Sequence, residues 1–67
     1  MRKSARPKEV VTYLEKNGFA FSRQRGSHAT YRHVDGRWTI VPLHNRDLPI
    51  GTLRGIFKRA NLPFEEF

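Results

Sequence analysis

The pair Asp35-Gly36 lies between two stretches of alternating polar and apolar residues, and it constrains the fold of this chain more than any other feature. The stretches read HATYRH at 28–33 and RWTIV at 37–41. Such alternation is typical of half-buried strands. An Asp-Gly pair accepts the positive φ angles of a two-residue type I′ turn, which joins antiparallel neighbours. We therefore predict a β-hairpin in which Val34 lies opposite Arg37.

A third strand and two helices complete the set of elements. FAFSRQ at 19–24 alternates in the same way, and the turn RGS separates it from the hairpin. Pro7 suits the first turn of a helix and Asn17-Gly18 supplies a stop, which predicts a helix over about 7–17. A second helix is predicted at about 50–60 from an apolar stripe, which consists of Leu53, Ile56, Phe57 and Ala60.

The resulting order, α-β-β-β-α, predicts an α+β fold with a three-stranded antiparallel sheet and both helices on one face. The other face of the sheet is then open to solvent. A chain of 67 residues suffices for one compact domain. We expect residues 1–67 to form that single unit, with 1–6 as a short basic N-terminal arm.

The assumed two-residue turn also fixes which side chains share a face, because side chains alternate strictly along a strand. The mostly apolar pairs, expected against the helices, are Val34–Arg37, His33–Trp38, Tyr31–Ile40 and Ala29–Pro42. The mostly polar pairs, expected on the open face, are Arg32–Thr39, Thr30–Val41 and His28–Leu43. His28 is thus expected on the uncovered side of the sheet.

Arginine dominates the charge of the chain, which has 13 Lys and Arg against 6 Asp and Glu. Nine of the 13 are arginine, whose planar fork matches phosphate oxygens two at a time. This favours a polyanionic partner, nucleic acid ahead of a membrane surface. There is no cysteine, and no apolar stretch approaches the length of about 20 residues that a membrane span needs. The expected location is the cytoplasm.

His28 is the candidate catalytic residue. Gly26 before it permits close approach of a ligand to the backbone. Arg23, Arg25 and Arg32 can hold a phosphate beside its ring. Imidazole is also the side chain best suited to proton transfer near neutral pH. The alternative is an ordinary surface histidine after a turn, and the residues alone leave both interpretations open.

Three motifs, taken in their order and spacing, resemble the HicA family of toxins from bacterial and archaeal toxin–antitoxin pairs. They are GSH at 26–28, VPLH at 41–44 and LPIGTLR at 48–54, and the resemblance covers nearly the whole chain. It implies a fold like the double-stranded-RNA-binding domain and the activity of an mRNA interferase, an endoribonuclease that cuts messages. It also implies a HicB antitoxin as the neutralising partner, and it places the essential histidine of the family at His28. Ile50 departs from the pattern, because the family often has lysine there.

Metal-free RNA cleavage needs a base for the 2′-hydroxyl, an acid for the departing 5′ oxygen and positive charge at the phosphorane. We expect His28 to be the base and Arg23, Arg25 or Arg32 to supply the charge. His44 is a candidate acid if its loop lies near, although a histidine after a strand-ending proline more often bonds to backbone; a single histidine serving both steps is the alternative. No spacing of histidines and carboxylates resembles a metal site, so neither a metal nor another cofactor is expected.

The second predicted helix carries three cations that suit an RNA backbone, namely Arg54, Lys58 and Arg59. Lys58 and Arg59 lie in its last turn, where cations also simply complement the helix dipole. Two function classes therefore compete, an RNA-cleaving toxin and a non-catalytic RNA-binding module of the same fold. A DNA-binding or purely partner-binding protein is a third class, for which the sequence offers no recognition helix or zipper.

Overall fold

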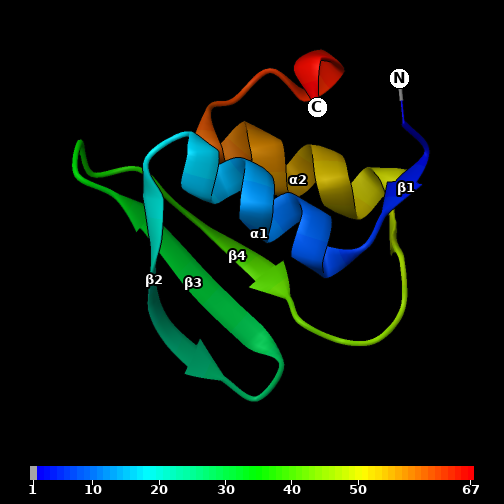
Figure 1. Ribbon diagram of the computed structural model, residues 1–67, viewed down its shortest axis with the longest axis horizontal. Coiled ribbons are helices and arrows are strands. Elements are labelled where there is room, and N and C mark those ends of the chain that lie inside the picture. The colour runs from blue at the N-terminus through cyan, green and yellow to red at the C-terminus, as the bar shows by residue number, and fades with distance from the viewer. Residues whose placement is uncertain (1) are drawn as a thin grey trace.

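The helices and the sheet form two layers, with both helices on the same face of the sheet (Figure 1). The computed structural model describes residues 2–67. Its elements are β1 (Ser4–Ala5), α1 (Pro7–Lys16), β2 (Phe19–Arg25), β3 (His28–His33), β4 (Trp38–Pro42), β5 (Leu48–Pro49), α2 (Ile50–Ala60) and the 3-10 turn η1 (Phe64–Glu66). The predicted α+β class and its three-stranded antiparallel sheet, of order β2-β3-β4, are confirmed. No helix in the described part of the chain is long and apolar enough to cross a membrane.

Helix α1 begins at the predicted residue and ends one residue earlier than predicted. Pro7 occupies its first turn, where the missing N–H leaves no helical hydrogen bond unmade. The Glu9 carboxylate reaches back and accepts a hydrogen bond from the Arg6 N–H at 2.9 Å, which closes the start of the helix. Val10 and Leu14 are completely buried, and their burial holds the helix in the core.

Helix α2 matches the prediction at both ends. It stops at Asn61, whose backbone is left-handed with a φ of 55°, a conformation that asparagine tolerates better than most residues. The predicted apolar stripe of this helix is buried, and it comprises Leu53, Ile56, Phe57 and Ala60. The two helices therefore supply most of one wall of the core.

The register between β3 and β4 differs from the prediction by one residue. The observed pairs are His28–Pro42, Ala29–Val41, Thr30–Ile40, Tyr31–Thr39 and Arg32–Trp38. The side chains of β3 lie on the expected faces of the sheet, but each side chain of β4 lies on the face opposite to the predicted one. Thr39 and Val41 are buried, whereas Trp38 and Ile40 are exposed beside Arg32 on the open face. Every predicted pair of this hairpin is therefore wrong by one position.

The reason for the shift is a turn of three residues in place of two. The His33 N–H donates to the Arg37 carbonyl at 2.8 Å, and the Gly36 N–H donates to the His33 carbonyl at 3.0 Å. Gly36 has a φ of 101°, as the last residue of a three-residue hairpin loop requires. Because Asp35-Gly36 suits either loop, this dipeptide does not by itself determine the register.

Thr39 shows how the observed register satisfies the core. Its side chain is fully buried, and its hydroxyl donates to the Ile56 carbonyl of α2 at 2.9 Å. A buried hydroxyl without such a partner costs about 1–3 kcal/mol. The next inward residue on β4, Val41, is also fully buried. The exchange of faces thus adds one satisfied hydroxyl and one aliphatic side chain to the interior.

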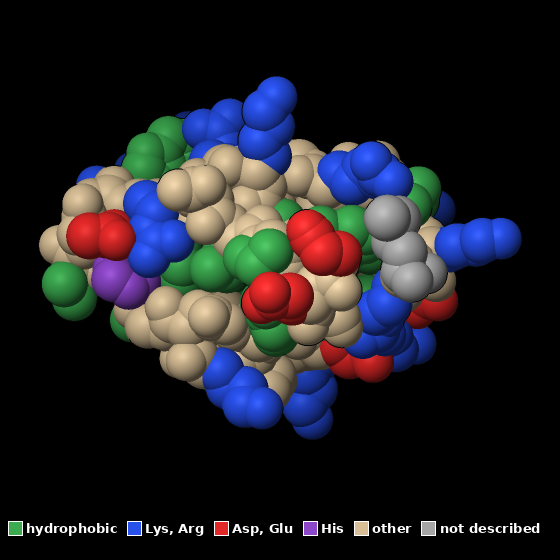
Figure 2. Space-filling view, turned by 90° about the horizontal axis from the view of Figure 1, so that it is seen from above, with side chains coloured by type: hydrophobic (Ala, Val, Ile, Leu, Met, Phe, Trp, Pro, Cys, Tyr) green, Lys and Arg blue, Asp and Glu red, His purple; other side chains and the backbone are tan. Residues whose placement is uncertain are grey.

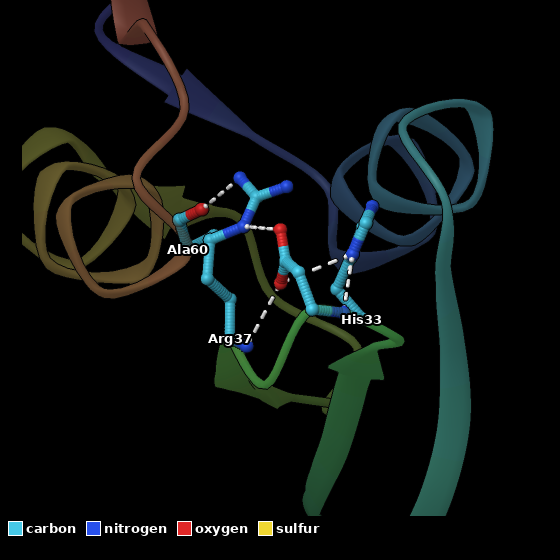
Figure 3. Close-up of polar contacts among 4 residues, drawn as sticks. His33, Arg37 and Ala60 are labelled. Carbon is cyan, nitrogen blue, oxygen red and sulfur yellow. Dashed lines mark hydrogen bonds and ion pairs between the residues drawn. The ribbon is translucent and has the colours of Figure 1, made fainter.

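Arg37 ties the hairpin to the end of α2 (Figure 3). Its guanidinium donates from Nε to Asp35 Oδ2 at 2.8 Å and from Nη1 to the Ala60 carbonyl at 2.8 Å. The Arg37 backbone N–H donates to Asp35 Oδ1 at 3.0 Å, and this bond, together with the guanidinium, holds the pKa of Asp35 below its ordinary value. His33 packs edge-on against Phe19, with ring centroids 5.2 Å apart. The hairpin tip is therefore fixed to the helical layer.

A small second sheet joins the predicted N-terminal arm to the segment just before α2, where no strand is predicted. β1 pairs antiparallel with β5, and Ala5 lies opposite Leu48. Both side chains belong to the core. The segment 2–6 is therefore not a free basic arm, and Met1 lies outside the described residues. Strands of two residues are too short to show the alternation by which strands are recognised in sequences.

Candidate nucleic-acid interface

An extra residue in β2 turns two arginines onto the open face of the sheet. Phe21 pairs with Tyr31, but Arg23 pairs with Thr30, so the register shifts between 21 and 23. Such a bulge reverses the alternation of side chains beyond it. Without the bulge, Arg23 and Arg25 would share the helix-covered face with Tyr31. The bulge is thus what makes the open face strongly basic.

His28 lies in a hollow on this open face. Arg25 is its partner across the β2–β3 pair, and the imidazole is exposed at the start of β3. The hollow has a volume of about 460 Å³, and it is lined by Arg23, Arg25, His28, Thr30 and Ile40. The structure therefore brings His28 together with two of the three arginines that the sequence analysis grouped with it.

A second hollow adjoins the first. It is lined by Ser22, Arg23, Thr30, Arg32, Trp38 and Ile40. Arg23, Thr30 and Ile40 line both hollows, so the two form one continuous surface. The third arginine of the predicted group, Arg32, lies in this second part, across from Trp38. We refer to the two hollows together as the open-face site.

The cations predicted on α2 separate into two groups. Arg59 lies over the ring of Trp38, with its guanidinium carbon 4.4 Å from the ring centroid, and it adds positive charge beside the open-face site. Lys58 and Arg54 instead line a hollow next to η1, where the Arg54 guanidinium carbon lies 5.9 Å from the ring centroid of Phe64. Of the three cations predicted on α2 to bind RNA, only Arg59 therefore lies beside the open-face site.

His44 lies in a different hollow from His28. That hollow includes Arg6 and Val11 from the start of the chain. The Nδ1 atom of His44 accepts a hydrogen bond from the Arg46 N–H at 3.3 Å. A bond of this kind organises the loop that follows β4. The two imidazoles are thus not placed in one site.

Charge is distributed differently on the two sides of the molecule. Within residues 2–67, no Asp or Glu lines the open-face site. On the side that carries the helices and the C-terminal turn, acidic and basic side chains are interspersed (Figure 2). There, for example, Glu9 forms an ion pair with Arg2 at 2.8 Å. The open-face site is therefore a surface of uncompensated positive charge.

A family model described as the HicA toxin of bacterial toxin–antitoxin matches this sequence over residues 7–62. The match covers most of the 67-residue chain. The chain belongs to the HicA toxin family. No curated protein sequence gives a match. Membership assigns the chain to the toxin side of a toxin–antitoxin system and implies an antitoxin as its partner.

Every residue that lines the open-face site falls inside the part of the chain that matches the HicA family. Guanidinium groups bind phosphate oxygens through charge-assisted hydrogen bonds, and an imidazole beside them can exchange a proton with a bound group. Within residues 2–67, no three His, Asp or Glu side chains are grouped closely enough to hold a metal ion. The chemistry available here is phosphate binding and proton transfer.

Trp38 and Ile40 are the residues of this HicA surface that the sequence analysis missed, because it placed both against the helices. They are 36% and 37% exposed, respectively. The signal that could have revealed them is the length of the hairpin turn. The run Trp-Thr-Ile-Val can form a strand with either Trp38 and Ile40 or Thr39 and Val41 facing the core. The residues of β4 therefore do not by themselves determine which pair is exposed.

Proposed function

We propose that this HicA-family chain is an endoribonuclease that cleaves mRNA without a metal ion and uses His28 as the general base. The observation that carries the proposal is the hollow that His28 shares with Arg23 and Arg25. A phosphodiester bound by these two guanidinium groups lies beside an exposed imidazole. The excess of cations over acidic residues in the whole chain also favours a polyanionic substrate.

RNA supplies its own nucleophile in this reaction, the 2′-hydroxyl. His28 takes the proton from the 2′ oxygen, which attacks the adjacent phosphorus. Arg23 and Arg25 stabilise the negative charge that develops on the phosphorane oxygens. The bond between phosphorus and the 5′ oxygen then breaks. The products are a 2′,3′-cyclic phosphate and a free 5′-hydroxyl, and DNA is not cleaved because it lacks the 2′-hydroxyl.

The proton for the departing 5′ oxygen comes from the same imidazole. His44 lines a different hollow, and His33 packs against Phe19 on the covered face. Neither therefore shares the hollow that holds His28. In this scheme, the imidazolium that forms when the 2′ oxygen loses its proton returns that proton when the 5′ oxygen leaves.

The antitoxin in this proposal is a HicB-type protein that covers the open-face site. Its chemistry follows from the surface that it must mask. Acidic side chains facing Arg23, Arg25 and Arg32 would compete with phosphate for the same guanidinium groups, and complementary charge of this kind speeds association. Bound there, the antitoxin excludes RNA from His28.

The experiment that tests the proposal compares wild type with His28→Ala on a defined single-stranded RNA in the presence of EDTA. We expect the variant to lose at least about 100-fold in cleavage rate while retaining RNA binding and its unfolding temperature. His44→Ala is the matched control and should cleave at the wild-type rate. An undiminished rate in His28→Ala would remove the assignment, and loss of wild-type cleavage on chelation would remove the metal-free mechanism.

A non-catalytic RNA-binding module is the second candidate, because the same cationic face and the exposed indole of Trp38 suit binding without chemistry. The two candidates differ in what happens to the RNA. Wild-type protein that binds RNA tightly and never shortens it, with or without divalent cations, would establish the module instead of the nuclease.

A further inference from the structure

We propose that Trp38 is a stacking platform for an unpaired nucleobase, so that the open-face site takes single-stranded RNA. The inference rests on the proposed function for the position of the scissile phosphate. It goes further by naming the kind of RNA that the site accepts and the residue that selects it.

Trp38 has the position of a binding residue and not of a core residue. Its cross-strand partner is Arg32, so the indole lies on the uncovered face of the sheet. The side chain is 36% exposed, although large aromatic residues are mostly buried in small domains. Arg59 lies over the ring at 4.4 Å from its centroid, and this contact holds the indole in one orientation. A ring that is both exposed and held in place is prepared to stack on a flat ligand.

The surroundings of Trp38 match the two parts of a nucleotide. Ile40 offers an apolar contact beside the indole, and Arg23 and Arg32 offer guanidinium groups for the phosphates. Within residues 2–67, no acidic side chain lines this hollow. An apolar peptide bound there would leave the arginines without partners. Aromatic rings set in a positively charged groove are the usual arrangement for binding single strands.

The distance between Trp38 and His28 determines which base stacks. Arg32, the partner of Trp38, lies four residues along β3 from His28. A strand rises about 3.3 Å per residue, which gives a separation of about 13 Å. The stacked base therefore belongs to a nucleotide that neighbours the cleavage point, and stacking fixes the position of the strand over His28. The bases of a duplex are already stacked on each other and are not available for this contact.

The fluorescence of Trp38 provides the test, because the chain contains one tryptophan. A His28→Ala protein, which leaves the RNA intact, is titrated with single-stranded oligo(A), with a duplex RNA of equal length and with an abasic oligonucleotide. We expect indole quenching by the single strand alone. By fluorescence anisotropy of a labelled single strand, Trp38→Ala should weaken binding about 5- to 150-fold, and Trp38→Phe should recover much of the loss.

Phe21→Ala is the matched control. Phe21 is an exposed aromatic residue of the same sheet, but it lies outside both hollows and packs near Tyr31. Its removal should leave the affinity for single strands unchanged. Equal quenching by the duplex or by the abasic strand would overturn the inference. So would wild-type affinity in a Trp38→Ala protein that has an unaltered circular dichroism spectrum.

The outcomes separate this inference from the proposed function. Cleavage that depends on His28, combined with an indole that does not respond to RNA, would remove the stacking platform and leave the nuclease. Quenching by single strands in a protein that never cuts RNA would remove the nuclease and support the platform.

Discussion

Arg59, in the last turn of α2, lies over the indole of Trp38 on β4, with its guanidinium carbon 4.4 Å from the ring centroid. Trp38 faces the uncovered side of the sheet, whereas α2 packs on the covered side. Because β4 is an edge strand of its sheet, the arginine can reach around that edge. The contact links the helical layer to the surface where we propose that RNA binds.

This link can be tested by removing Arg59. We expect Arg59→Ala to shift the emission of the single tryptophan and to weaken binding of single-stranded RNA about 2- to 5-fold, since an exposed cation–π contact contributes about 0.5–1 kcal/mol. Lys58→Ala removes an equal charge from the neighbouring position, which lines the hollow next to η1. The emission of Lys58→Ala should therefore equal that of the wild type. A shift of the same size in both variants would show that charge alone, and not the stacked geometry, is responsible.

Salt dependence measures the phosphate contacts of the open-face site. Arg25→Gln removes one guanidinium next to His28, so the slope of log K against log salt for single-stranded RNA should become shallower by about 0.7. Arg46→Gln is the control, because Arg46 is exposed in the loop after β4 and lies outside both hollows. Its slope should match that of the wild type. Equal slopes for all three proteins would contradict the assignment of Arg25 to a phosphate.

Stability at acid pH depends on the bonds of Asp35 in the hairpin. Its pKa is lowered in the folded chain, first by the bond from the Arg37 N–H and then by the guanidinium. The stabilisation is therefore complete above the ordinary value of 3.8 and is lost as the pH falls through the lower, folded pKa. Asp35→Asn should show a smaller loss of unfolding temperature than the wild type between about pH 5 and about pH 2. Parallel curves for the two proteins would exclude this contribution.

Two glycines should respond to alanine in opposite directions. Gly55 lies on the exposed side of α2, and an added Cβ would meet nothing within 4 Å, so Gly55→Ala should stabilise the fold by about 0.5–1 kcal/mol. Gly18 has a φ of 88°, and a Cβ there would lie 2.7 Å from Nε2 of His33. Gly18→Ala should therefore destabilise the fold by more than about 1 kcal/mol. Urea unfolding of both variants measures the change in the free energy of unfolding and so checks both signs. A destabilised Gly55→Ala would indicate a role for that glycine beyond the helix.

The helices were predictable because each carries its signals within its own stretch of sequence. Pro7 marks the start of α1, and the apolar stripe of α2 has the helical period over the whole element. The pairing of β3 with β4 depends instead on the conformation of a turn. Asp35-Gly36 fits loops of two or three residues, and the choice is made by contacts far away in sequence, such as the bond from Thr39 to Ile56. Local sequence therefore predicted the strands but not their register.

The candidate site was predictable to a similar extent. The nearness of His28 to Arg25 follows from a short turn between β2 and β3, and it could be inferred from the residues. The position of Trp38 on the open face could not be inferred from the residues, because it depends on the register of β4. The separation of Arg54 and Lys58 from the open face also depends on how α2 is rotated on the sheet, which periodicity alone leaves undetermined.

The bulge in β2 leaves one residue, Ser22, outside the regular pairing of the strand. Deleting its codon would keep all nine arginines and would remove the shift between 21 and 23, with Arg23 still opposite Thr30. Arg23 and Arg25 would therefore stay on the open face. One residue inserted beside Ser22 would instead move Arg23 opposite Ala29 and turn both arginines toward the helices, which would dismantle the basic surface with its histidine intact.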